Sequence, residues 1–473
     1  MIVDRHAPVD LFALVPRLQV TFEPELAALD RLLDDDLLFQ QVKADLARRH
    51  PRSAARGRPS TPVEVILRML VVRRLYDWSY AETEHFVSDR LVLRQFCRLS
   101  LAPAPDDTTL LRWAACIGPA TLERVHERVV ALARQGKVTR GRKLRTDGTV
   151  VETTIHYPTD GTLLADGVRV LSRLVGQAKT LVGTRASGAA RQAQALFRDR
   201  TRSAKRLARQ IQETVRRRGP AAEAGRRAAY QRLLQVATAS LRQAQRVRRC
   251  LDPVAPARGK SARAARLATQ LTHFVPLVAQ VVRQTQRRVL RGEPVPASEK
   301  LVSLFEPHTR VIRRGKVHLP AEFGRKVWLD EVDGGIVSRY AVLDGNPPEA
   351  HQVPASLGHH CRQFGRPPQV FAGDRGVYSP TNERLAHAVG VRHVALPQPG
   401  AKSVARVDYE RQRWFRRAYR FRAGAEGRIS VCKRRGWLGR CRDHGEQGFA
   451  CWIGWGIITA NLATIARTVA ARP

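Results

Sequence analysis

The sequence predicts an α/β protein in which a mixed sheet is flanked by helices, preceded by an all-α module and interrupted by a helical insertion. Three observations support this prediction. Apolar residues recur at helical spacing through residues 8–135. Short runs rich in Val and Thr then alternate with helical segments after residue 143 and again after residue 301, as in α/β folds. The tract between them, residues 165–300, is basic and helical in spacing.

The first 135 residues are expected to form a helical DNA-binding domain. Residues 8–50 are rich in Leu, a helix begins after Thr61 and Pro62, and two short helices follow at residues 80–88 and 91–99. Asp107 is expected to cap a further helix that leads into residues 121–135. Short helices with basic faces indicate a helix-turn-helix-like module, and an ordinary helical bundle is the alternative.

The strands are expected in residues 136–164 and 301–473, which together would form the catalytic core. The run LRTDGTVVETTIHYP contains Asp147, and PPQVFAGDRGVY ends in Asp374. Further strands are expected in TRVIRRGK, RKVWLDEV, GGIVSRYAVLDGN and RHVALP, with a helix near residues 354–364 and a long basic helix over residues 408–435. Since functional side chains gather at strand ends in open α/β sheets, the two Asp residues could share a Mg²⁺ site. Each alone is more often a turn or cap residue, and two-metal phosphodiester chemistry requires a third carboxylate.

The basic stretch AYRFRAGAEGRISVCKRRGW supplies that carboxylate. In a helix, Tyr419, Arg422, Glu426 and Lys433 fall within an arc of about 60°. One face would then carry a phenol, a guanidinium, a carboxylate and an ammonium, which suits a metal ligand between phosphate-binding groups. A surface helix with an Arg422–Glu426 pair at i, i+4 is the structural alternative. Gly424 and Gly427 argue against a helix selected only for stability, because each costs about 1 kcal/mol relative to Ala.

These residues resemble the YREK signature of bacterial insertion-sequence DDE transposases at every spacing, downstream of two suitably placed Asp residues. The resemblance extends over roughly residues 55–466 and includes TDGTVVETTIHYPTD, RRGKVHLPAEFGRKVWL, GDRGVYSPTNERL and IGWGIITANLATIA. It implies an RNase H-like mixed sheet with Asp147 on the first strand, Asp374 after the fourth and Glu426 on a following helix. These three carboxylates would bind two Mg²⁺ ions, with Mn²⁺ as a substitute.

The same resemblance implies further roles and partners. Tyr419, Arg422 and Lys433 would hold transposon-end DNA, and the partners would be double-stranded DNA at the transposon ends and target, with the protein acting as a homodimer. No nucleotide cofactor is expected. The chain departs from the family pattern because Asp374 and Glu426 are only 52 positions apart, whereas 227 positions separate Asp147 from Asp374. The long interval holds the basic insertion, which is expected to bind flanking DNA or a second protomer.

Charge supports nucleic acid as the partner. The 473 residues include 82 Lys and Arg against 42 Asp and Glu, a net charge of +40, and 43% hydrophobic residues exclude a wholly disordered basic tail. Residues 447–466 approach the length of a membrane span, but polar residues and glycines favour a buried helix. The polar N-terminus lacks the apolar stretch of a signal peptide, so a cytoplasmic protein without a membrane partner is expected.

The cysteines do not indicate a metal site. None of the seven Cys residues has zinc-site spacing, although Cys432, Cys441, His444 and Cys451 lie close together in sequence, and reduced thiols are expected.

Three alternative functions are considered. A tyrosine recombinase with Tyr419 as nucleophile would need a preceding set of Arg, Lys and His that cannot be assembled in order. A non-catalytic DNA-binding protein derived from a transposase is a second alternative. RNA binding is a third, and the low aromatic content of 6% disfavours it.

Overall fold

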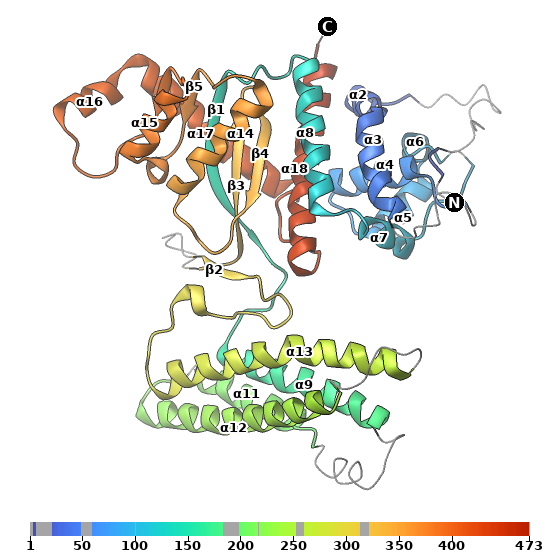
Figure 1. The fold of residues 1–473 in the computed structure, drawn as a ribbon, viewed down its shortest axis with the longest axis vertical. Helices are drawn as coiled ribbons and strands as arrows, with labels where there is room; N and C mark the ends of the chain where they lie inside the picture. Colours follow the sequence, from blue (N-terminus) through green and yellow to red (C-terminus); the bar gives the residue numbers. More distant parts are fainter. Residues whose placement is uncertain are drawn as a thin grey trace. The chain divides into compact units, whose positions relative to one another are not determined.

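The computed structural model describes residues 3–5, 21–48, 59–99, 101–182, 198–215, 217–251, 260–312 and 321–472 (Figure 1). The chain divides into two compact units. The first combines Met1–Thr153 with Arg325–Pro473, and the second is Thr154–Gly324. The basic helical tract therefore folds as a unit of its own, inserted between two stretches that fold together.

The N-terminal part of the first unit is helical, as predicted. Its helices are α2 (Pro24–Leu33), α3 (Asp36–Ala47), α4 (Val63–Leu75), α5 (Tyr80–Asp89), α6 (Leu91–Phe96), α7 (Asp107–Ala114) and α8 (Pro119–Gln135). A fully buried guanidinium, that of Arg68 on α4, ties three of them together. It donates to Asp30 Oδ1 of α2 at 2.7 Å, to Glu64 Oε1 at 3.2 Å and to the Phe96 carbonyl of α6 at 3.1 Å. Since a buried charge is tolerated only when it is paired, this network fixes the packing of α2 and α6 against α4.

A six-stranded mixed sheet has the order β2-β3-β1-β5-β6, with β4 paired to β3. The strands are β1 (Lys143–Glu152), β2 (Arg310–Ile312), β3 (Glu322–Val332), β4 (Ile336–Val342), β5 (Val370–Ala372) and β6 (His393–Ala395). Strand β5 runs parallel to both β1 and β6, whereas β3 is antiparallel to β2 and β4. The Asp333 amide donates to the Lys143 carbonyl, so the end of β3 lies beside the start of β1.

Helices cover both faces of this sheet. On β3, the side chain of Asp330 bonds Ser356 of α14 (Val353–Phe364), whereas its neighbour Glu331 pairs with Arg428 of α17 (Arg413–Arg434). Because successive side chains of a strand point to opposite faces, α14 and α17 lie on opposite sides of the sheet. Helix α17 also packs Phe415 and Ala418 on β5 and β6. The short helices η3 (Glu349–Gln352), η4 (Arg375–Val377), α15 (Pro380–Ala388) and α16 (Val404–Arg411) connect these elements.

The apolar C-terminal helix, α18 (Gly445–Ala470), is long and apolar enough to cross a membrane, but 89% of its most apolar window is buried inside the protein. It contacts α2, α4, α8 and β4, and Figure 1 shows it alongside α8. Asn461 Oδ1 accepts from the Val337 amide at 2.9 Å, and its Nδ2 donates to the Val337 carbonyl at 2.8 Å. The expectation of a buried helix is therefore confirmed, and its central polar residue bonds the edge strand β4.

In the described part of the second unit, four long helices form a bundle with its own apolar core. They are α9 (Asp160–Val182), α11 (Thr201–Val215), α12 (Pro220–Leu251) and α13 (Lys260–Thr285). The turn η1 (Gln286–Leu290) and the short helix η2 (Ala297–Glu299) follow α13. Each helix contacts its neighbours along one apolar face, which leaves the basic side chains on the outside.

Three predictions of element boundaries were wrong. The cap of α7 is Asp106, not Asp107, because the Asp106 carboxylate accepts from the Thr109 amide. The basic helix expected over residues 408–435 breaks at Gln412, whose extended backbone separates α16 from α17. The insertion helix begins at Asp160 rather than near residue 165. Parts of the helical prediction for residues 8–50 and the strand prediction for residues 313–316 lie outside the described residues.

We predict that the N461L variant is less stable than wild type by about 1–3 kcal/mol, because the buried Val337 amide loses its partner, while the Val337 carbonyl keeps its bond to His126. Thr459 on the same helix is equally buried, but its hydroxyl has no hydrogen-bond partner, so T459V should be neutral or slightly stabilising. Urea unfolding followed by tryptophan fluorescence measures both. Equal losses for the two variants would contradict the role of the Asn461 amide.

Candidate active site

The parallel register of β1 and β5 places the two candidate Asp residues side by side. Arg145 of β1 pairs with Ala372 of β5, and Asp147 and Asp374 each follow two residues later. Neighbouring strands lie roughly 5 Å apart, so the two carboxylates emerge next to each other where the strands separate. The Asp374 carboxylate accepts from the amides of Gly376 and Val377, which fixes its orientation. Asp147 in turn accepts from the Gly148 amide at 2.8 Å.

Helix α17 approaches β1 closely at Gly424. Arg145 of β1 donates through Nη1 to the Phe421 carbonyl of α17 at 2.5 Å. The same guanidinium pairs with Glu331 of β3 at 2.6 Å and 2.9 Å. A Cβ atom at Gly424 would collide with Arg145, whereas one at Gly427 would meet nothing within 4 Å. Gly424 therefore permits the close approach that brings the rest of α17 over the end of β1.

The guanidinium of Arg422 joins the three candidate carboxylates. Its Nη2 lies 3.4 Å from Asp147 Oδ2 and 3.8 Å from Asp374 Oδ2, and its Nη1 donates to Glu426 Oε1 at 2.7 Å. The structure thus brings together one acid from β1, one that follows β5 and one from α17. The i, i+4 pair that the sequence also predicted is present, but its guanidinium extends beyond the helix to both Asp residues.

Burial and charge have opposite effects in this cluster. Burial raises the pKa of Asp147 to about 6; Arg422 and the Gly148 amide oppose the shift, and nearby Asp374 and Glu349 add to it. Burial alone would lower the pKa of Arg422, but Asp147, Asp374 and Glu426 outweigh it and the pKa is raised. Arg422 therefore stays charged and holds together carboxylates that would otherwise repel one another.

The sequence predictions missed a fourth acid in the cluster, Glu349 on η3. Its Oε1 lies 3.0 Å from Nζ of Lys326, which is almost fully buried on β3. Cβ atoms on Gly148 and Gly376 would lie 2.9 Å and 3.4 Å from the two Glu349 carboxylate oxygens. Glu349 therefore occupies the space between the segments that carry the two Asp residues. The glycine after Asp147 and the one two positions after Asp374 were the sequence signals that something approaches there.

The other members of the signature lie along α17. Tyr419 precedes Arg422 by one turn and is 39% exposed. Lys433 lies two turns beyond Glu426, in the last turn of the helix. The predicted helix is confirmed, so the phenol, the guanidinium, the Glu426 carboxylate and the ammonium do share one side of a single helix. The structure brings Arg422 into the acidic cluster, and it places Tyr419 and Lys433 on either side of the cluster along the helix.

The chemistry of the carboxylate cluster suits a hard cation, since Mg²⁺ prefers oxygen ligands and is bound in proteins through carboxylates. Among the described residues, no three His, Cys, Asp or Glu side chains lie close enough together to hold a metal ion in their present positions. Arg422 supplies the positive charge instead, within 3.8 Å of each carboxylate. The donors fit a metal, and binding requires Arg422 to release at least part of the cluster.

Other buried acids and the thiols have structural roles. Asp330 accepts from Trp328 Nε1 and Ser356 Oγ and pairs with Arg339, on the opposite face of the sheet. The Cys441 thiol donates to the Asp443 carbonyl and the Cys451 thiol to the Ile117 carbonyl. Within the described part of the chain, Cys432, Cys441, His444 and Cys451 are not gathered into a group that could hold a metal ion.

Comparison with known proteins gives one match. Residues 14–115 match the family described as a transposase domain, DUF772. This range ends just after α7, so the N-terminal helices of the first unit are similar to a domain found in transposases. No curated protein and no solved structure matches the sequence.

We predict that G424A and G427A have opposite effects, although both replace a glycine within α17. G424A should destabilise the protein by about 2 kcal/mol or more, because the new methyl group displaces Arg145 from the Phe421 carbonyl. G427A should be stabilising by up to about 1 kcal/mol, the helix-propensity difference, since its methyl group enters open space. Thermal unfolding by circular dichroism measures both. Equal stabilisation by the two variants would contradict the close contact at Gly424.

We predict that Asp147 makes stability depend on pH between about 4 and 6. In the folded protein its pKa is about 6, against an ordinary value of 3.8, so the folded state binds more protons than the unfolded state in this window. The stability of wild type should therefore fall as the pH rises from 4 to 6, relative to D147N. The resulting loss in the free energy of unfolding of wild type, relative to D147N, should reach at most about 3 kcal/mol above pH 6.

Urea unfolding at pH 4, 5, 6 and 7 tests this difference. The control is E152Q, at the end of the same strand, because the Glu152 side chain is 41% exposed. A D147N-minus-wild-type difference that stays constant from pH 4 to 7 would show that the Asp147 carboxyl is not perturbed.

Proposed function

We propose that the protein is a DDE transposase of an insertion sequence, which binds transposon-end DNA and catalyses metal-dependent cleavage and transfer of DNA strands. The observation that carries this proposal is the convergence of Asp147, Asp374 and Glu426 on one guanidinium. In a chain with a net charge of +40, three carboxylates drawn from separate elements to one sheet edge indicate a site for cations that act on a polyanion.

The positions of the acids support an RNase H-like core. Asp147 lies on β1, the first strand, and Asp374 follows β5, which is the fourth strand when the three-residue β2 is left aside. Glu426 lies on the later helix α17. These are the positions that the resemblance to DDE transposases implies. The match of residues 14–115 to a transposase domain independently supports a transposase, because it involves the N-terminal helices and none of the three acids.

In this proposal Asp147, Asp374 and Glu426 would hold two Mg²⁺ ions, for which Mn²⁺ could substitute. The bound ions would activate water or a DNA 3′-hydroxyl for in-line attack and stabilise the leaving 3′-oxygen. Burial raises the pKa of Asp147, and a cation bound beside this carboxyl would lower it again by favouring the charged form. Arg422, on releasing the carboxylates, remains beside them with five donors for a phosphate.

The remaining residues of the signature would position DNA. Tyr419 and Lys433 lie on the same helix as Arg422 and provide a hydroxyl donor on one side of the acids and an ammonium on the other. Contacts from Tyr419, Arg422 and Lys433 to the backbone of transposon-end DNA would fix the scissile bond over the carboxylates. We further propose that the N-terminal helices recognise the end sequence, and that the protein acts in the cytoplasm as a homodimer on double-stranded DNA.

The decisive experiment is cleavage of a labelled duplex that carries the DNA flanking this reading frame. We predict 3′-hydroxyl products with Mg²⁺ and none with EDTA. The D147N, D374N and E426Q variants should each lose at least about two orders of magnitude in cleavage rate, equivalent to roughly 3 kcal/mol of transition-state stabilisation. Binding of the same duplex should change by less than about threefold, and E152Q should cleave like wild type.

Other outcomes distinguish the alternatives. Unchanged activity in all three carboxylate variants would favour a non-catalytic DNA-binding protein. A covalent adduct that requires Tyr419, formed in EDTA, would favour a tyrosine recombinase. Tighter binding of RNA than of duplex DNA at matched salt would favour an RNA-binding role.

A further inference from the structure

The inserted unit holds a large share of the positive charge. Residues 154–324 contain 34 Lys and Arg and 10 Asp and Glu, so they contribute +24 of the total +40. Two of these acids are paired within the unit, Asp160 with Arg288 and Glu299 with Arg287. The excess of positive charge on this unit therefore favours binding of an external anion.

The shortage of acids is most extreme on helices α12 and α13. Between Glu223 and Glu293 the sequence contains a single acid, Asp252, which lies outside the described residues. Fifteen Lys and Arg occupy the same interval. The described part of α13 thus carries no carboxylate, and α12 carries only Glu223, in its first turn.

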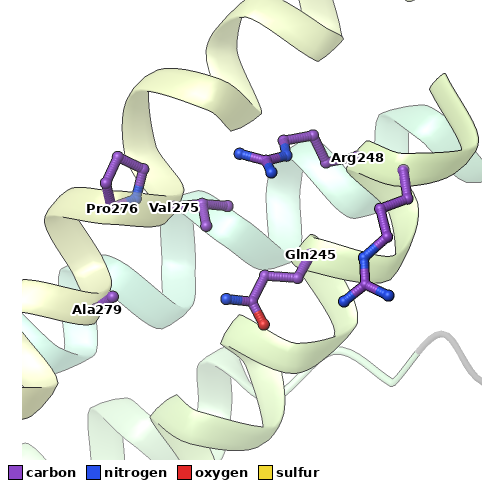
Figure 2. A pocket seen from close by; sticks show the side chains of 6 residues that line it. Gln245, Arg248, Val275, Pro276 and Ala279 are labelled. Carbon is purple, nitrogen blue, oxygen red and sulfur yellow. The ribbon is translucent and has the colours of Figure 1, made fainter. Parts of the chain in front are cut away.

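A pocket of about 320 Å³ lies between these two helices. Figure 2 shows Gln245 and Arg248 extending from one helix and Val275, Pro276 and Ala279 lining the other side. Arg249 completes the lining. Arg248 Nε is buried from solvent and has no hydrogen-bond partner. Because a buried donor without an acceptor is costly, the Arg248 guanidinium, which lines the pocket, is not fully satisfied by the described residues around it.

The two sides of the pocket differ in chemistry. The α12 side offers two guanidinium groups and an amide, which suit the oxygens of a phosphate and the polar edge of a base. The α13 side offers aliphatic carbon from Val275, Pro276 and Ala279, which suits a flat or apolar face. Inorganic phosphate would use only the first side, and a hydrocarbon only the second. A volume of about 320 Å³ is at the small end of the range for ligand sites.

We infer that this pocket binds a nucleotide, with Arg248 and Arg249 on the phosphate, Val275, Pro276 and Ala279 against the base or sugar, and Gln245 at its polar edge. The nucleotide comes either from an unpaired position in a DNA strand or from a free mononucleotide, since both present the same chemistry. This inference goes beyond the proposed function, because it assigns to the insertion a nucleotide site that takes no part in the carboxylate chemistry.

Two kinds of variant of the full-length protein test the pocket. R248Q/R249Q removes the phosphate ligands, and A279F fills the space without changing charge. The matched control is R242Q/R246Q, which removes two positive charges from exposed positions on the same helix. Fluorescence anisotropy measures binding of a labelled single-stranded oligonucleotide in EDTA, so that metal-dependent cleavage does not contribute. Repeating it in the E426Q background separates the result from the proposed active site.

R248Q/R249Q and A279F should each weaken binding at least about tenfold, and R242Q/R246Q less than about threefold. The slope of log affinity against log salt should fall in magnitude by about 0.7 for R248Q/R249Q, as expected for one lost phosphate contact on single-stranded DNA, and stay unchanged for A279F. Competition by deoxyadenosine monophosphate at millimolar concentration would identify a free nucleotide as a ligand. Competition by unlabelled oligonucleotide alone would identify the DNA strand.

Three results would overturn the inference. Equal weakening by R248Q/R249Q and R242Q/R246Q would mean that surface charge alone is responsible. Wild-type binding by A279F, or by A279L where the larger residue lowers the unfolding midpoint, would mean that the pocket is not entered. Equal competition by inorganic phosphate and by deoxyadenosine monophosphate would exclude a contact to the base or sugar.

Discussion

The two hydrogen bonds between Asn461 and Val337 fix the position of α18, and the rest of the first unit is arranged around that helix. An amide in the middle of an apolar helix must find partners, and the exposed edge of β4 has an unpaired amide and carbonyl to offer. His126 of α8 bonds the same Val337 carbonyl through Nε2 at 2.7 Å. One backbone position of the sheet is thus joined to α18 and α8 at once.

This arrangement explains why the N-terminal helices and the sheet form one unit. Arg74 of α4 is fully buried, donates to the Trp437 carbonyl at 2.7 Å and lies 3.7 Å from the ring of Trp452 on α18. Burial lowers the pKa of Arg74 to about 9, so the hydrogen bonds and the ring must compensate for desolvation of its charge. The helices similar to a transposase domain are therefore packed on the same C-terminal helix that supports the sheet and its carboxylates.

Local sequence patterns predicted most of the helices and strands. They did not predict side chains whose role depends on contacts with residues far away in the sequence. The side shared by Tyr419, Arg422, Glu426 and Lys433 follows from helical spacing alone, and α17 has that spacing. Glu349 and Lys326 were missed because neither belongs to a spaced motif, and they meet only when η3 folds over β3. The sequence showed that Gly424 lowers the stability of an isolated helix. It could not show why a glycine is needed there, because the Arg145 guanidinium that excludes a larger residue lies 279 positions earlier.

Arginine has different roles in the two units. In the first unit arginines connect segments of the fold, whereas in the insertion they are available for a ligand. In the first unit Arg68, Arg145 and Arg422 pair with carboxylates of distant segments, and Arg74 donates to the Trp437 carbonyl, so each of these guanidinium groups has partners within the fold. In the insertion, α12 and α13 lack acids after Glu223, and the buried Nε of Arg248 has no partner. Positive charge without a partner lowers stability, because like charges repel one another. Since the first unit provides partners for its buried arginines, the unpaired charge of the insertion is best explained by binding of an external anion. Of the net charge of +40, the insertion therefore carries +24 and the first unit +16, so the excess is greatest in the unit whose long helices offer the fewest internal partners.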